Sequence, residues 1–362
     1  MNQLARVAPF RERLWEAVVA GDEYAAVAAV QDALADGIGE EAVLLEVVAP
    51  VQETIGTDWA ANRISVAREH AATAINERVV AALALRPRPD GVQRAARGRV
   101  TVGCVDGEWH SFPARLVAEV LRLRGWQVDY LGAQTPTPHL IAHLHHTDPQ
   151  AVLLSSSLPT RLPAAHMAIT ACQAVGVPVL AGGRAFGANG RYARALGADG
   201  WAPDARGVGD VLAGGLPRPT PAAVRQVADD LPHLADQEYT LVIHSKGPLV
   251  KQTLTDLEDR FPAVRSYTDV QRERTAEDVA HLVDFLACAL YVDDAEVFTA
   301  FLAWTADILE ARGVPARSLS AGLDLLARQL HDFPRALNIL NEGVHALDAR
   351  PSTPIADHET TA

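Results

Sequence analysis

The chain has 362 residues, of which 49% are hydrophobic and 21% are charged, and its formal net charge is -13. This composition predicts a globular protein of two or three domains, and the negative charge gives no electrostatic reason to expect nucleic-acid binding. The three cysteines are too few and too scattered for a disulfide framework or a zinc site. Because we find no signal peptide and no long apolar run, we expect a cytoplasmic protein without a membrane segment.

Residues 1–90 are predicted to form a bundle of four helices. Apolar residues recur there at helical spacing, and glycines interrupt the pattern. Ser65 is the expected N-cap of the fourth helix. The segment 86–91, rich in proline and arginine, is expected to be a linker. The four helices are expected at 9–20, 22–36, 39–57 and 65–85.

Trp59 is followed, after nine residues, by Glu69 and His70. A tryptophan ring can pack over a flat ligand, a glutamate can accept hydrogen bonds from hydroxyl groups, and a histidine can bind a metal. The spacing corresponds to about three helical turns, so the three side chains would share a face if the segment were one helix. The alternative is that Trp59 belongs to the core and that the other two lie on a solvated face.

Residues 98–214 are predicted to form a doubly wound parallel sheet of Rossmann-like type, because apolar segments alternate with amphipathic ones. The apolar segments are 100–105, 128–131, 151–154 and 177–181. In such sheets ligands bind beyond the carboxyl ends of the strands. Polar and small residues fall at these ends, namely Glu108 and His110 after the first strand, Ser156 and Leu158 after the third, and Gly182 and Gly183 after the fourth.

This succession of acidic-x-His, Ser-x-Leu and Gly-Gly resembles the cobalamin-binding domain of methionine synthase, the cobalamin mutases and the cobalamin photoreceptors. The resemblance implies that His110 is the lower axial ligand of cobalt, with Glu108 on its other ring nitrogen. Small residues at 156, 182 and 183 would leave room for the nucleotide tail. Pro113 stands where the family has glycine, so the loop under the cobalt is expected to differ in shape, although proline is tolerated where a helix opens.

The Trp-x9-Glu-His pattern resembles the cap bundle of light-sensing, adenosylcobalamin-dependent transcriptional repressors. The resemblance implies that Trp59, Glu69 and His70 lie over the upper face of cobalamin, beside the adenosyl group. His70 could then take the sixth cobalt position once the alkyl group leaves. Those repressors begin with a helix-turn-helix domain, for which the residues before this bundle leave no room, so direct contact with nucleic acid is not expected.

Residues 222–350 are predicted to form a helical domain of globin size, preceded by a second linker and followed by a tail at 351–362. Helices are expected near 222–231, 235–260, 273–291, 294–312, 315–331 and 333–347.

The helical domain has a set of residues that suits a flat tetrapyrrole. Its aromatic side chains (Phe285, Phe298, Phe301, Trp304) would take the rings, His281 would meet the pyrrole nitrogens, and Arg272 and Arg274 would pair with the propionates, with Lys246 and Lys251 in reserve. The alternative is that His281 is an ordinary core or surface histidine. Cys288 is a candidate thiol for a covalent link, but its apolar surroundings favour a core position.

The order of the domains resembles the photocobilins, photoreceptors in which a cobalamin-binding module precedes a globin-like, biliverdin-binding domain. The resemblance implies a light sensor in which light changes the upper cobalt bond and biliverdin extends the colour range. Its output would pass through a change of homo-oligomer or through a separate protein partner. Two alternatives stay open: a corrinoid methyl-carrier subunit of a methyltransferase, and a cobalamin sensor without photochemistry whose last domain binds haem or docks a protein. No catalytic residues are expected.

Overall fold

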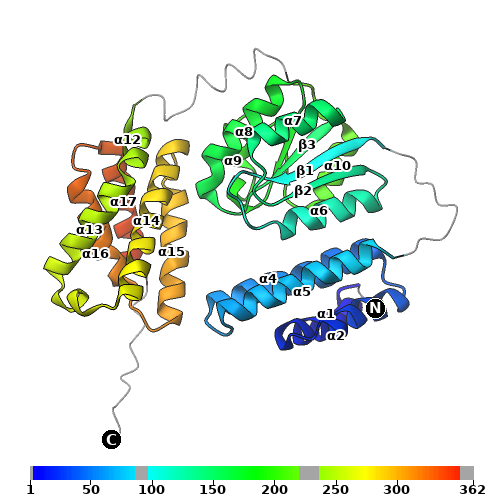
Figure 1. Cartoon of the computed structure of the whole chain (residues 1–362), viewed down its shortest axis with the longest axis horizontal. Helices are drawn as coiled ribbons and strands as arrows, with labels where there is room; N and C mark the ends of the chain where they lie inside the picture. The colour runs from blue at the N-terminus through cyan, green and yellow to red at the C-terminus, as the bar shows by residue number, and fades with distance from the viewer. Residues whose placement is uncertain (1–2, 87–96, 220–235, 351–362) are drawn as a thin grey trace, which may run out of the picture. The chain divides into compact units, whose positions relative to one another are not determined.

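The structure is a computed structural model that describes residues 3–86, 97–219 and 236–350 (Figure 1). The chain divides into two compact units, Met1–Ala235 and Asp236–Ala362, and each is described by itself. Among the described residues, no helix combines the length and the apolar character needed to cross a membrane.

The first unit begins with a helical cap, as predicted. Its second helix starts at the N-cap Asp22, and its last starts at Ser65, whose side chain accepts a hydrogen bond from the backbone N–H of Arg68 at 3.2 Å, as the sequence predicted. The third helix contains a π-helical stretch. The elements are α1 (Gln3–Ala20), α2 (Glu23–Ala35), α3 (Glu40–Ala42), the π-helical η1 (Val43–Val48), α4 (Ala49–Ala60) and α5 (Val66–Ala84).

A five-stranded parallel sheet follows, with strand order β2-β1-β3-β4-β5, which confirms the predicted doubly wound architecture. The four predicted strands are β1 (Arg99–Cys104), β2 (Gln127–Gly132), β3 (Ala151–Ser155) and β4 (Val179–Gly182). The last of them starts two residues later than expected, because Pro178 has no N–H to give to the sheet. A fifth strand, β5 (Gly200–Ala202), was not predicted, because three residues are too short for a periodic pattern.

Helices cover both faces of the sheet (Figure 1). They are α6 (Phe112–Leu123), α7 (Thr137–Thr147), η2 (Pro159–Arg161), α8 (Leu162–Ala174), η3 (Arg184–Phe186), α9 (Arg191–Ala195) and α10 (Ala205–Gly214). The helix α6 is strongly amphipathic and joins the two parts of the unit. Its residues Phe112, Leu116 and Val120 are buried in the same apolar cluster as Val47 and Val79 of the cap. The cap therefore packs on the sheet domain through an apolar cluster that it shares with α6.

Ion pairs fasten the start of the third cap helix to the sheet domain. Arg124 donates two hydrogen bonds to the carboxylate of Glu41, at 2.8 and 3.0 Å, and Arg206 donates one to Glu46 at 2.6 Å. The hydrogen bond from Arg124 lowers the pKa of the Glu41 carboxyl group, so this carboxylate stays charged. We call these four residues the clasp.

The second unit is helical in its described part. Its elements are α12 (Glu238–His244), α13 (Lys246–Arg260), η5 (Pro262–Ser266), α14 (Asp269–Val292), α15 (Glu296–Ala311), α16 (Arg317–Gln329) and α17 (Pro334–Asp348). The prediction of one helix over 235–260 was wrong. The helix breaks at Ser245, because Pro248 lacks an N–H and its ring would clash with the carbonyl of residue 244. The helix predicted over 222–231 lies outside the described residues.

Candidate functional site

Glu108 organises the loops at the carboxyl end of the sheet. Its carboxylate is fully buried and accepts hydrogen bonds from the backbone N–H groups of Ser157 and Leu158, at 2.7 and 3.0 Å, and from the Ser156 hydroxyl at 3.0 Å. Burial by itself would raise the pKa of Glu108, but the hydrogen bonds from His110 and from the two backbone groups lower it to about 2. A charged carboxylate thus holds together two loops that are distant in sequence.

His110 is oriented by the same carboxylate. Its Nδ1 lies 2.6 Å from Oε1 of Glu108, and its backbone N–H donates to the same oxygen at 2.9 Å. The imidazole side chain is 55% exposed, so the other ring nitrogen, Nε2, faces outward from the paired edge. A histidine whose Nδ1–H is held by a carboxylate presents the Nε2 lone pair, which is how metal-binding histidines are commonly oriented.

The loop that holds His110 is itself well fixed. Gly107 turns the chain with a φ of 76°, and the backbone N–H of Gln134 donates to the carbonyl of Glu108 at 3.0 Å. The hydroxyl of Tyr130 donates to the carbonyl of Ser111 at 3.2 Å. The helix α6 then opens with Pro113 in its first turn, where the missing N–H costs no hydrogen bond, as predicted.

A cavity of about 210 Å³ lies beside these loops, between the sheet, α6, α10 and the cap. Apart from Ser155 and Asp204 its lining is apolar, and the carboxylate of Asp204 already accepts the backbone N–H of Gly207. The π-helical stretch of the cap reaches this cavity as well. Lining residues from cap, helix and strand ends include Leu45, Ala49, Leu116, Leu154, Gly182 and Gly183.

The two predicted glycines are needed here for different reasons. Gly183 has a φ of 101°, and a Cβ atom at this position would lie 2.2 Å from the carbonyl oxygen of Ser156. This close approach of the two loops excludes any side chain. At Gly182 a Cβ atom would be in ordinary contact, 3.5 Å from the carbonyl of Ala202, so this glycine mainly keeps the cavity open.

Trp59, Glu69 and His70 do not lie on one helix, so the condition under which a three-turn spacing would have put them on one face is not met. The helix α4 ends at Ala60, and α5 begins at Val66. The turn between them is fixed by the buried Asp58, which accepts hydrogen bonds from Arg63 at 2.8 and 2.5 Å and from the indole of Trp15 at 3.2 Å.

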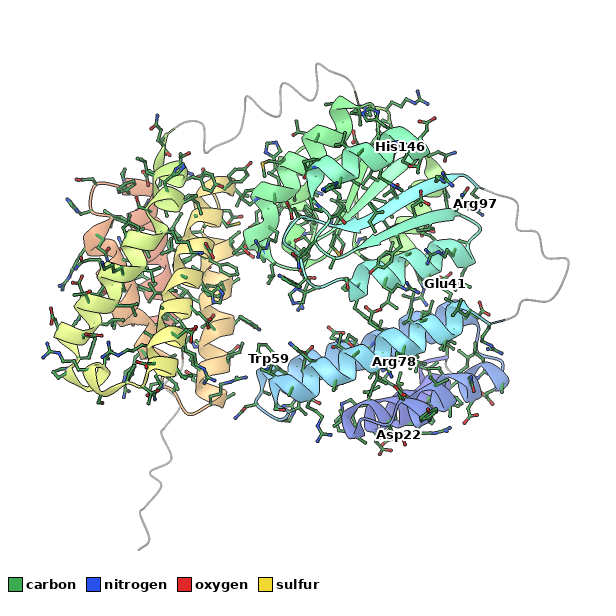
Figure 2. The ribbon with its side chains drawn as sticks, in the orientation of Figure 1. Asp22, Glu41, Trp59, Arg78, Arg97 and His146 are labelled. Carbon is green, nitrogen blue, oxygen red and sulfur yellow. The ribbon has the colours of Figure 1, made fainter. Side chains whose placement is uncertain are left out.

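The turn nevertheless brings the three predicted residues to the same end of the α4–α5 pair. Trp59 is the second-last residue of α4, and Glu69 and His70 lie in the first turns of α5. Figure 2 shows Trp59 and Glu41 at opposite ends of the third cap helix. The Nδ1 atom of His70 lies 2.5 Å from Oε2 of Glu69, and the His70 side chain is 75% exposed.

In the second unit the predicted cations lie on different faces of α14. Nine residues separate Arg272 from His281, which is about two and a half helical turns and places them on opposite faces. Arg272 also bonds to Glu258 and to the carbonyl of Tyr267. Arg274 is seven residues from His281, about two turns, so these two exposed side chains share a face.

The aromatic residues of this unit are partly core and partly surface. Phe285 stacks on Phe301 with ring centroids 3.8 Å apart, Phe298 is fully buried, and Trp304 is 49% exposed. Cys288 is buried, and burial raises the pKa of its thiol, so a core position is favoured over a reactive one. Of the reserve cations, Lys246 is paired with Asp284 at 2.6 Å.

Two parts of the chain match known protein families. Residues 10–84 match one family described as a B12 binding domain, and residues 98–208 match a second family with the same description. The HTH-type transcriptional repressor CarA of Myxococcus xanthus is 32% identical over 149 residues, which make up 40% of this chain and 47% of the repressor. The chain therefore spans less than half the length of this curated relative.

Solved structures of corrinoid proteins also resemble part of the chain. The monomethylamine corrinoid protein of Methanosarcina barkeri matches 57% of this chain and 97% of its own, with 17% identity and a TM-score of 0.47. A cobalamin-binding protein from Desulfitobacterium hafniense DCB-2 matches the same shares with 18% identity and a TM-score of 0.32. The methanol:cobalamin methyltransferase complex MtaBC from Methanosarcina barkeri matches 57% of this chain and 79% of its own, with 16% identity and a TM-score of 0.30.

The residues at the carboxyl end of the sheet fit a bound cobalamin. A cavity of roughly 150 Å³ is enough to hold benzene, so the larger apolar cavity has room for the base of a nucleotide tail. At the same end of the sheet His110 presents an exposed imidazole whose Nδ1 is held by a buried carboxylate, as in metal-binding histidines. With residues 10–84 and 98–208 each matching a B12 binding domain, the chain is a cobalamin-binding protein with a two-part binding module.

Proposed function

We propose that this protein is a light sensor that uses adenosylcobalamin and signals through movement of its cap. The observation that carries the proposal is the second carboxylate–imidazole pair, Glu69–His70, beside Trp59 at one end of the α4–α5 pair. This pair has the same residue types as Glu108–His110, but it lies in the cap. A simple corrinoid carrier would need no second metal ligand there. Bound adenosylcobalamin would supply a cobalt–carbon bond that light can break.

The lower face of the cofactor is assigned to the sheet domain. His110 would hold cobalt through Nε2, and Glu108 holds its Nδ1–H, which fixes the tautomer and raises the basicity of the ligand. The apolar cavity lined by Gly182 and Gly183 would take the nucleotide tail. The Ser156–Leu158 loop holds Glu108 in place by three hydrogen bonds.

The upper face is assigned to the cap. Trp59 would pack over the adenosyl group, Glu69 would accept hydrogen bonds from ribose hydroxyls, and His70 would be the side chain available to the upper face of cobalt. A cap that makes different contacts in the two states shifts its position between them. The output is then a change of homo-oligomer or of binding to a partner protein.

A second chromophore in the second unit is part of the same proposal. Biliverdin would lie along the face of α14 that carries Arg274 and His281, with Phe285 and Trp304 beside the rings and the cation near a propionate. Arg272 is assigned no role in this site, because it lies on the opposite face and is already bonded to Glu258. Haem is the competing ligand, since an exposed histidine can also bind iron.

The test is an absorption spectrum of the full chain, loaded with adenosylcobalamin in the dark and then illuminated, with and without biliverdin. We expect a light-dependent spectral change in the wild type and an altered or short-lived photoproduct in Trp59→Ala and His70→Ala. His145→Ala, on the exposed face of α7, is the matched control and should behave as wild type.

Three outcomes would each contradict a different part of the proposal. Photolysis and recovery that are the same in wild type, Trp59→Ala and His70→Ala would remove the role of the cap. Methyl transfer from a methyl donor in the dark would favour a corrinoid methyl carrier. An iron-dependent Soret band from the second unit, without red absorption after addition of biliverdin, would replace the bilin by haem.

A further inference from the structure

We infer that Thr73 and Gln52 are positioning residues, which orient His70 through a chain of hydrogen bonds inside the cap. The inference rests on the proposed function, because it states how the upper-face histidine is presented. The chain of hydrogen bonds runs from Asn76, in the core of the cap, to the exposed ring of His70, and it uses side chains of both α4 and α5.

All four links of the chain are within hydrogen-bonding distance. The side-chain amide of Asn76 donates to Oε1 of Gln52 at 2.8 Å, and the amide of Gln52 donates to the hydroxyl oxygen of Thr73 at 2.7 Å. The Thr73 hydroxyl donates to Oε1 of Glu69 at 3.0 Å, and Oε2 of Glu69 lies 2.5 Å from Nδ1 of His70.

The direction of these bonds is fixed by what each group can donate. Gln52 gives an N–H to the oxygen of Thr73, so the hydroxyl hydrogen must point elsewhere, and it points to Glu69. A carboxylate accepts only, so Glu69 receives this hydrogen on one oxygen and the Nδ1–H of His70 on the other. The proton of the neutral ring is thereby placed on Nδ1, and Nε2 is left with its lone pair.

Asn76 anchors the chain at a cost to stability. Its side chain is fully buried, and among the described residues its Oδ1 has no hydrogen-bond partner. Leaving a buried polar atom without a partner costs about 1–3 kcal/mol, which an apolar side chain at this position would avoid. The asparagine offsets this cost by donating an amide N–H to Gln52, which an apolar side chain could not do.

The same hydrogen bonds could serve only to hold α4 against α5. The experiment therefore has to detect the orientation of His70 itself. Long-range 1H–15N NMR spectra of the full-length protein without cofactor report which ring nitrogen of each histidine carries the proton. The His70 signals are assigned by their absence in His70→Gln. We expect the Nδ1–H form in the wild type and in Thr73→Ser, and loss of this preference in Thr73→Val and Gln52→Leu.

Thr54→Val is the matched control, because Thr54 is an exposed threonine of α4 whose hydroxyl donates to the carbonyl of Pro50 and takes no part in the chain. An Nε2–H form of His70 in the wild type would overturn the inference. So would an unchanged His70 spectrum in Thr73→Val, provided that its thermal unfolding shows a folded cap.

The illuminated, cobalamin-loaded protein gives the second measurement. We expect imidazole ligation in the photoproduct to form about 10-fold less in Thr73→Val than in wild type, a loss typical of removing a partner behind a metal ligand, and to recover in Thr73→Ser. A wild type that shows the Nδ1–H form but no spectral response to light would overturn the light-sensor function and leave the positioning of His70 established.

Discussion

The two carboxylate–histidine pairs of the first unit have similar distances between Nδ1 and the carboxylate and very different support. Nδ1 lies 2.6 Å from the carboxylate in Glu108–His110 and 2.5 Å in Glu69–His70. Glu108 is fully buried and receives three backbone N–H groups, whereas the Glu69 side chain is 23% exposed and is held by one threonine hydroxyl. The comparison teaches that the same residue pair can be rigidly or loosely supported. In the proposed function, burial of the carboxylate would separate a permanent ligand from an exchangeable one.

The largest expected difference between the two pairs is in stability. Glu108→Ala should lower the free energy of unfolding by about 3 kcal/mol or more, because the donors at Ser157 and Leu158 lose their acceptor and each costs about 1–3 kcal/mol. Glu69→Ala, at a partly exposed site, should cost less than about 1 kcal/mol. Urea unfolding of the protein without cofactor measures both values. Equal losses would show that the two carboxylates contribute equally to the free energy of unfolding.

A smaller difference is expected in the dark affinity for cobalamin. Glu108→Gln should weaken binding by about 10- to 100-fold, because it removes the partner behind His110, the proposed lower ligand. Glu69→Gln should change the affinity by less than about threefold, since the sheet domain supplies most contacts in the proposed complex. Titration of the protein without cofactor, followed by absorbance, gives both constants. A greater loss in Glu69→Gln would reverse the assignment of the two faces.

The smallest expected difference is a dependence of stability on acid pH. The pKa of Glu108 is about 2 in the folded protein, below its ordinary value of 4.5. A lowered pKa gives stability that is fully present above about pH 4.5 and is lost as the pH falls toward 2. The difference in the free energy of unfolding between wild type and Glu108→Gln should therefore shrink between about pH 5 and pH 3, by at most about 1.4 kcal/mol per pH unit. An advantage that stays constant over this range would contradict the charged state of Glu108.

Much of the first unit could be predicted because its signals are local. Apolar periodicity placed the cap helices and four strands, and Glu108 and His110 are only two residues apart, so their contact needs no knowledge of the fold. The contact of Glu108 with Ser156 spans 48 residues, and only the assembled sheet brings these loops together. The strand β5 was missed because three residues carry no pattern.

The hydrogen-bond chain in the cap was also missed, although a signal for it exists. Glu69, Thr73 and Asn76 are spaced by four and three residues, which places them along one face of α5. Polar residues at such spacing usually indicate a solvated face. Their partner Gln52 lies on another helix, so the polar stripe becomes an internal chain only when α4 packs against α5.

The π-helical stretch η1 (Val43–Val48) sets the angular phase of the third cap helix. Glu41 and Glu46 fasten its beginning to the sheet domain through the clasp, while Trp59 lies near its far end. Each π turn holds an additional residue, and each residue of an α-helix turns the chain by about 100°. Deleting one residue within η1 would convert the π turn into an α turn of about the same rotation, so the direction of Trp59 would be kept. Deleting one residue of α4 between η1 and Trp59 would instead swing Trp59 by roughly a quarter turn about the helix axis while the clasp stayed closed. Loss of a single residue is therefore absorbed within η1, but it changes the direction of Trp59 when it occurs farther along the helix.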